Sequence, residues 1–146
     1  MFPFTGLGRL PDGTSATEDN FGFVFGVNHL GHFLLTNLLL DLLRKSAPSR
    51  VVTVSSKMHE FSPALNFTRE DPAVASFLYP YLESYPVSKL ANVLFARELA
   101  RREAASGVIS ASLHPGLIHT PIWKSTCSAH SPLMTAMYHA LSPLMW

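Results

Sequence analysis

The chain has 146 residues, of which 47% are hydrophobic and 14% are charged, and its formal net charge is +1 at pH 7. The charged share lies below the roughly 25% of an ordinary soluble domain, and the high apolar share excludes an intrinsically disordered chain. A net charge of +1 gives no general electrostatic attraction to nucleic acid, so we expect no nucleic-acid partner.

The N-terminal segment, residues 1–20, is rich in Gly, Thr, Pro and Asp and is predicted to be irregular. It has no basic start followed by an apolar core, so no secretory signal is visible. The single cysteine, Cys127, excludes an internal disulfide, which is compatible with a reducing compartment. We therefore expect an intracellular protein, either cytoplasmic or membrane-associated.

The stretch 21–43 has no charged residue before Asp41 and is long and apolar enough to cross a bilayer. Polar side chains nevertheless recur every four residues, at Asn28, His32 and Thr36, and so follow one face of a helix. Because burying them in lipid without partners is costly, the pattern favours a helix packed inside the protein whose polar stripe faces a site. Glycines at positions 22, 26 and 31 predict a kink or a late start.

The middle of the chain follows a strand–helix–strand pattern. The β-branched run Arg50–Ser56 predicts a buried strand, and 57–84 is predicted to be a loop with short helical pieces. Pro86–Ser106 has apolar residues at helical spacing and predicts a long helix, with Gly107 at its C-terminal cap. Val108–Leu113 predicts a second strand, parallel to the first and reached by a right-handed connection. Because two parallel strands are too few for a stable sheet, we expect an α/β fold that is part of a larger sheet.

Tyr85 and Lys89 begin the predicted long helix and lie one turn apart, so their side chains share a face. A phenol, whose pKa is ordinarily ~10, is a poor acid–base group at neutral pH. A neighbouring ammonium and the positive end of a helix both favour the phenolate, which could exchange a proton with a carbonyl or alcohol oxygen. Tyr79 and Tyr81 have no lysine four residues later and are not candidates for this role.

Other catalytic arrangements are weaker in this sequence. His29 and His32 are three residues apart and could share a metal ion, but no acidic residue or cysteine has suitable spacing nearby, so we expect no metal site. No serine lies in a Gly-x-Ser-x-Gly segment, which argues against a hydrolase built on that motif.

Four short segments carry a family resemblance, in this order along the chain: Val27–Phe33, Arg50–Ser56, Tyr85–Asn92 and His114–Thr120. Together they closely resemble the short-chain dehydrogenases/reductases, in particular the branch that contains the retinol dehydrogenases. The resemblance implies part of a Rossmann-like, doubly wound parallel sheet. It also implies hydride transfer between NAD(P) and an apolar alcohol or carbonyl compound such as a retinoid, a steroid or a lipid aldehyde.

The resemblance further implies a catalytic tetrad of Asn28, Ser56, Tyr85 and Lys89. Tyr85 would be the general acid or base, and Ser56 would hydrogen-bond the substrate oxygen. Lys89 would favour the phenolate of the tyrosine and bind the cofactor ribose, and Asn28 would fix a water molecule from a kink in its helix. The residues implied in cofactor binding, besides Tyr85 and Lys89, are Pro115, Gly116 and Thr120.

The family's cofactor-binding half has no counterpart in the sequence. Family members begin with a strand and a turn of the form Thr-Gly-x-x-x-Gly-x-Gly, whose backbone binds the cofactor pyrophosphate. Thr5–Gly8 only partly matches this turn. We therefore expect a chain truncated at both ends, in which 21–120 is the catalytic half and 121–146 is an apolar tail covering the substrate. For lack of this turn we expect NAD(P) binding to be impaired and the chain on its own to be inactive.

Two functions remain open on the sequence alone. The first is an oxidoreductase whose partner is an apolar small molecule. The second is an inactive fragment that acts, if at all, as an interaction module and forms homo- or heterodimers through the helices 24–44 and 86–106. No feature specifically indicates membrane association. In either case we expect the isolated chain to expose apolar surface and an unpaired strand edge, and to self-associate.

Overall fold

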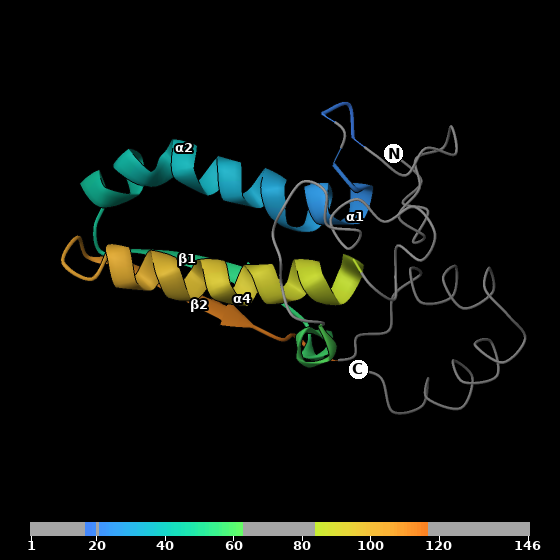
Figure 1. Cartoon of the computed structure of the whole chain (residues 1–146). Helices are drawn as coiled ribbons and strands as arrows, with labels where there is room; N and C mark the ends of the chain where they lie inside the picture. The colour runs from blue at the N-terminus through green and yellow to red at the C-terminus, as the bar shows by residue number, and fades with distance from the viewer. Residues whose placement is uncertain (1–16, 20, 63–83, 117–146) are drawn as a thin grey trace, which may run out of the picture.

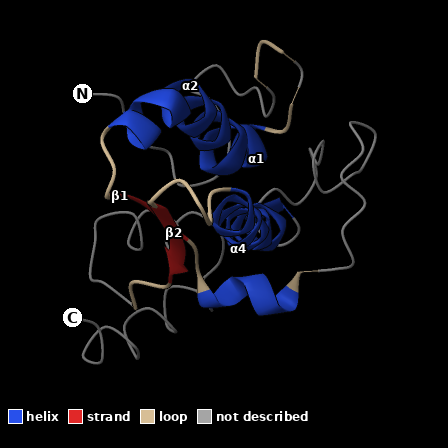
Figure 2. Cartoon of the chain, turned by 90° about the vertical axis from the view of Figure 1, so that its left-hand side faces the viewer, coloured by secondary structure: helices blue, strands red, loops and turns tan. Residues whose placement is uncertain are grey.

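The computed structural model describes residues 17–19, 21–62 and 84–116. In this part of the chain, two long helical segments lie beside a pair of parallel strands (Figure 1). The helix α4 (Tyr85–Arg102) covers one face of the sheet, and α2 (Gly31–Lys45) runs beside α4 near β1 (Ser49–Val54; Figure 2). This arrangement confirms the predicted α/β class.

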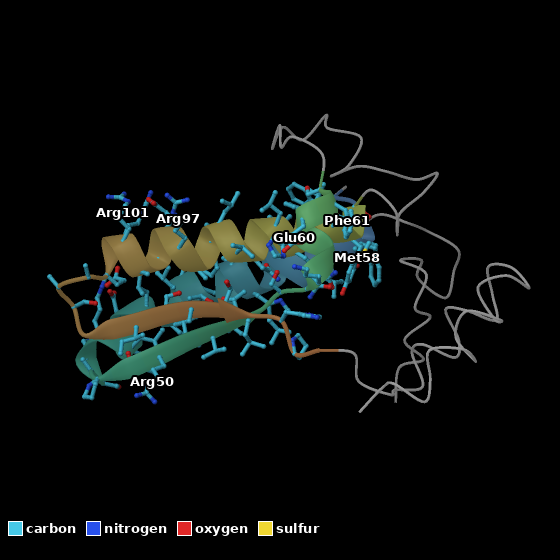
Figure 3. The ribbon with its side chains drawn as sticks, turned by 90° about the horizontal axis from the view of Figure 1, so that it is seen from below. Arg50, Met58, Glu60, Phe61, Arg97 and Arg101 are labelled. Atoms are coloured by element: carbon cyan, nitrogen blue, oxygen red, sulfur yellow. The ribbon has the colours of Figure 1, made fainter. Side chains whose placement is uncertain are left out.

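Several predicted segments lie outside the described residues. They are most of the irregular segment 1–20, the larger part of the loop predicted for 57–84, and the tail 121–146. The described start of that loop is the short 3-10 helix η2 (Lys57–Phe61), which packs against α4. Figure 3 shows Met58, Glu60 and Phe61 of η2 at the same end of the molecule as the start of α4.

The first helical segment is continuous but changes its winding. It starts as α1 (Phe23–Phe25), widens into the π-helix η1 (Gly26–Leu30) and continues as α2. The irregularity predicted from the glycines is therefore a π-helical turn, a feature that occurs frequently at functional sites. The π-helical turn begins at Gly26 and is followed by Gly31. A glycine has no side chain that stabilises a regular α-helix, so a change of winding is tolerated here.

The helix α2 is less covered than its sequence predicts. No residue of α2 is buried, and its large apolar side chains are exposed: Phe33, Leu34, Leu35, Leu38, Leu39 and Leu42. The prediction of a helix packed inside the protein is thus wrong for α2, which contacts β1 and, through Phe33, Phe95 of α4 but has no buried residue. By length and composition, Phe23–Lys45 could also cross a membrane, with a mean hydropathy of 1.4.

The two strands pair in parallel and in the predicted order. β1 pairs with β2 (Val108–Leu113), and the register runs from Ser49 opposite Val108 to Val54 opposite Leu113. On the face that α4 covers, Thr53 of β1 and Val108 of β2 are buried, and the other alternate residues of the two strands are half-buried. On the opposite face, large apolar side chains of both strands are exposed: Val52, Val54, Ile109 and Leu113. The predicted exposed apolar surface is therefore present among the described residues.

The helix α4 starts as predicted and ends earlier than predicted. Pro86 lies in its first turn, where the missing backbone donor is harmless. Its buried side contributes Val87 and Ala91, which form the core cluster together with Phe25. Glu103, rather than Gly107, caps the C-terminus, and its backbone N–H donates to the Leu99 carbonyl.

Gly107 has a different role from the predicted helix cap. Its φ of 78° lies in the left-handed region, and it directly precedes β2. Its carbonyl accepts a hydrogen bond of 3.2 Å from the Ser49 backbone N–H, which begins the pairing of the two strands. The glycine is therefore required by the turn that leads into β2.

Candidate active site

Tyr85 and Lys89 occupy the first turns of α4, beside the C-terminal end of β1. The Lys89 Nζ lies 5.5 Å from the centroid of the Tyr85 ring, so the predicted pair shares one helix face. Lys89 Nζ also donates a hydrogen bond of 3.2 Å to the Val54 carbonyl at the end of β1. Partial burial lowers the pKa of the Lys89 ammonium. The strand thus anchors a cation next to the phenol ring.

Asn28 lies in the π-helical turn and reaches across to α4. Its Nδ2 donates to the Ser88 Oγ at 3.1 Å, and Ser88 Oγ donates to the Tyr85 carbonyl at 2.8 Å. Ser88 is fully buried, so this chain of hydrogen bonds is enclosed between the two helices. The structure therefore brings Asn28, Tyr85 and Lys89 together at one end of the helix pair.

Ser56 follows β1 and begins η2. Its backbone is extended, and its Oγ accepts a hydrogen bond of 3.3 Å from the Met58 N–H, which makes Ser56 the N-cap of η2. The neighbouring Ser55 is buried instead, and its Oγ donates to the Lys89 carbonyl at 2.7 Å. Ser56 therefore lies at the strand end that the sequence predicts, while Ser55 bonds β1 to α4.

A cavity of about 240 Å³ lies between α2, β1 and α4. Asn28 and Lys89 line it together with His32, Asn92 and the residues of β1 from Val51 to Val54. The volume is below the roughly 300–1,000 Å³ of sites that enclose a drug-sized ligand. The described cavity is therefore a recess beside Lys89, too small to enclose a dinucleotide.

The residues implied in cofactor binding after β2 are only partly described. Pro115 and Gly116 are exposed in the segment that leaves β2, and Gly116 has a φ of 84°. Nothing lies within 4 Å of the position that a Cβ on Gly116 would take. Thr120 lies outside the described residues.

The two histidines of the first helical segment have separate environments. His29 Nδ1 lies 2.9 Å from the Asn92 Oδ1, whereas His32 Nδ1 lies 3.3 Å from the Asn28 carbonyl. Over the ranges 17–19, 21–62 and 84–116, no three metal-ligating side chains come together.

Sequence reasoning missed three polar residues that bond the site to its surroundings: Ser55, Ser88 and Asn92. Ser88 and Asn92 lie three residues after Tyr85 and Lys89 respectively. Residues three and four apart share a helix face, so this spacing was the signal that could have revealed both.

Several known proteins are similar to this chain over most of its length. No family model matches the chain. Retinol dehydrogenase 14 of Homo sapiens is 50% identical over 118 residues, which cover 81% of this chain and 33% of that protein. Retinol dehydrogenase 13 of Homo sapiens is 44% identical over 141 residues, which cover 97% of this chain and 40% of that protein. The chain is homologous to part of the retinol dehydrogenases. It is thus related to the short-chain dehydrogenases/reductases.

A solved structure supports the same relationship at the level of the fold. The crystal structure of an uncharacterized protein from Mycobacterium paratuberculosis matches with a TM-score of 0.56 and 34% sequence identity. The match covers 86% of this chain and 51% of that one. The parallel strands and helices of the retinol dehydrogenase homologue therefore form part of a Rossmann-like fold.

Only part of the family's length is represented. The chain spans about a third of retinol dehydrogenase 14 and 40% of retinol dehydrogenase 13. The similarity therefore relates this chain to about a third to two fifths of these proteins and does not extend to their full length.

Proposed function

We propose that this chain carries the proton-transfer centre of an NAD(P)-dependent oxidoreductase that interconverts an apolar alcohol and its carbonyl compound. The observation that carries the proposal is the placement of the Lys89 Nζ 5.5 Å from the Tyr85 ring centroid while the Val54 carbonyl holds it. A fixed cation beside a phenol favours the phenolate, the form that accepts a proton. Retinoids, steroids and lipid aldehydes are the substrate classes proposed.

Each member of the tetrad has a proposed task at a stated atom. The Tyr85 Oη gives a proton to the carbonyl oxygen in reduction and takes it from the alcohol in oxidation. The Ser56 Oγ donates a hydrogen bond to the same substrate oxygen and holds it in place. Lys89 stabilises the phenolate form of Tyr85, and Asn28 fixes a water molecule near the lysine.

The described residues fit only one end of NAD(P). Lys89 and Tyr85 carry hydrogen-bond donors for a ribose, and Gly116, beside which nothing lies within 4 Å of a Cβ position, is proposed to lie next to the nicotinamide end. The sequence has no complete glycine-rich turn for the pyrophosphate, because Thr5–Gly8 matches it only in part. When bound, NAD(P) supplies or accepts the hydride, while the chain supplies position and the proton.

Titration of the purified 146-residue chain with NADPH and NADH, followed by calorimetry, tests this proposal. We expect weak binding, because the residues proposed to bind NAD(P) reach only its nicotinamide end. Turnover is then assayed at saturating cofactor with a retinoid and with a short lipid aldehyde. Binding in the micromolar range together with turnover would support the oxidoreductase and exclude the inactive module. Failure to bind either cofactor at millimolar concentration would favour the module.

The alternative function is supported by the exposed apolar face of α2. Leu38 is 73% exposed and Leu42 is 60% exposed, which is unusual for adjacent turns of one helix in a monomer. An inactive module would use this face to pair with a second copy or with a related chain. The inactive module would be supported if the chain shows no turnover and forms a dimer that Leu38→Glu disrupts. A dimer unaffected by this change would contradict pairing through α2.

A further inference from the structure

Asn92 is the point at which three elements of the site meet. It lies on α4, one turn after Lys89, and is only 3% exposed. Its Nδ2 donates to the Asn28 carbonyl at 3.0 Å and to the Val54 carbonyl at 3.2 Å. Its Oδ1 lies 2.9 Å from the His29 Nδ1. One buried amide therefore joins the π-helical turn, the end of β1 and α4.

These partners determine the orientation of the Asn92 amide and the tautomer of His29. The NH₂ group must face the two carbonyl oxygens, because a flipped amide would place its own oxygen against both of them. The Oδ1 then accepts a hydrogen bond, so His29 must carry a proton on Nδ1 and donate it.

The surroundings of His29 reinforce this arrangement. Its ring centroid lies 5.2 Å from that of Phe25, 5.9 Å from that of Phe33 and 6.2 Å from that of Phe95. Burial in this cluster lowers the pKa of the His29 imidazole, which favours the neutral ring. A neutral ring protonated on Nδ1 is the form that orients Asn92.

The Val54 carbonyl connects Asn92 to the catalytic pair. This oxygen accepts hydrogen bonds from both the Asn92 Nδ2 and the Lys89 Nζ, each at 3.2 Å. A carbonyl oxygen has two lone pairs, so the two donors occupy its full capacity. We propose that Asn92, oriented by His29, is a positioning residue that fixes the Val54 carbonyl for Lys89 and holds the Asn28 backbone in place. Its importance for turnover rests on the proposed function.

Several charged and titratable groups near Lys89 can also influence its pKa and must be considered when the effect of Asn92 on Lys89 is measured. Tyr85 lies one turn away on the same helix, and His32 of α2 lines the same cavity. The helix η2, which packs against α4, carries His59 and an ion pair between Lys57 and Glu60. A substitution at position 92 leaves all of these charged and titratable side chains in the sequence, but it removes hydrogen bonds to His29 and to the Asn28 carbonyl, which His32 also contacts.

The experiment is a pH titration of lysine side chains by NMR on the complete chain. The sequence has four lysines, so selective ¹³Cε labelling gives four resonances, and loss of one in Lys89→Arg assigns Lys89. In Asn92→Ala, the Val54 carbonyl loses the donor that holds it in place, so its hydrogen bond to the charged Lys89 ammonium weakens. We therefore expect the titration midpoint of Lys89 to fall by roughly half a pH unit, the size of a modest lost interaction.

Two further variants make the result decisive. Asn37→Ala removes an exposed amide that bonds the Phe33 carbonyl within α2, and it should leave the Lys89 midpoint unchanged. His29→Phe keeps an aromatic ring among the phenylalanines and removes the hydrogen bond to Asn92. It should shift the titration midpoint of Lys89 in the same direction as Asn92→Ala does. It also tests the proposal if Asn92→Ala does not fold.

An unchanged Lys89 midpoint in a folded Asn92→Ala chain with a lower Tm would overturn the proposal and leave Asn92 a purely structural residue. If Asn92→Ala does not fold, an unchanged midpoint in His29→Phe would overturn it. Absence of turnover in the unsubstituted chain would count against the proposed function only, because the NMR readout needs neither cofactor nor substrate.

Discussion

The proposed general acid, Tyr85, differs from a phenylalanine only by its hydroxyl group. Tyr85→Phe should lower turnover by roughly 10²- to 10⁴-fold, the usual contribution of a general acid or base, because it removes only the exchangeable proton. Circular dichroism should remain unchanged. Tyr79→Phe is the matched control, since Tyr79 has no lysine four residues later and should keep full activity. Equal turnover in the two variants would refute the assignment of Tyr85.

A second residue pair links the far ends of the two long helices. The Arg44 Nε and Nη2 donate to the two carboxylate oxygens of Glu103 at 2.9 and 2.6 Å, and the Glu103 side chain is almost fully buried. These hydrogen bonds, with one from Ser106, lower the pKa of the Glu103 carboxyl. The folded chain thus prefers the ionised form more strongly than the unfolded chain does.

This preference predicts how the stability depends on pH. The stabilisation is complete above the ordinary glutamate pKa of ~4.3 and is lost as the pH falls through the lower folded value. Melting curves should therefore show Glu103→Gln less stable than the unsubstituted chain at pH 7, with the difference shrinking below pH 4. The exposed Glu60, paired with Lys57, provides the control, and Glu60→Gln should have a much smaller effect. A difference that grows on acidification would contradict the assignment.

At the scale of the elements, the turn that joins α4 to β2 depends on the left-handed backbone conformation of Gly107. Gly107 and Gly116 both have a positive φ, but a Cβ on Gly107 would lie 3.0 Å from the Ala47 Cβ, whereas a Cβ on Gly116 meets nothing within 4 Å. Gly116→Ala should therefore destabilise the chain only through the left-handed conformation, by about 1–2 kcal/mol at most. Gly107→Ala should destabilise it further, because Ala47 must also move. Chemical denaturation measures both, and equal values would show that the contact with Ala47 is unimportant.

The same elements show how far the sequence predicts this structure. The bounds of β2 match the prediction, because the short segment Val108–Leu113 lies between the turn residue Gly107 and the His114–Pro115–Gly116 segment. The end of α4 was predicted too late, at Ser106 before Gly107, whereas the helix ends at Arg102 and Glu103 caps it. The tertiary role of Asn92 was missed because its partners lie on other elements. Local patterns predict periodicity and turns, whereas long-range polar partners become visible only in three dimensions.

For the whole molecule, the exposed apolar surface predicts association. Apolar side chains of α2 and of the open face of the sheet both face solvent. Light scattering after gel filtration should therefore give a mass above the 16.1 kDa of one chain. Leu38→Glu and Val52→Thr test the two surfaces separately, and the one that restores a monomer identifies the contact. A monodisperse monomer that melts cooperatively without either substitution would contradict this prediction.

The π-helical turn between Gly26 and Leu30 also constrains how this helix can tolerate insertions and deletions. A π-helical turn closes i→i+5 hydrogen bonds and so holds one residue more than an α-helical turn. Removing one residue here would convert the wide turn into an α-helical one, so Asn28 or His29 would lose its present direction toward α4 while the leucines of α2 kept theirs. A single-residue deletion should thus harm the polar site more than the helix itself, because the extra residue of the wide turn lets both side chains reach α4.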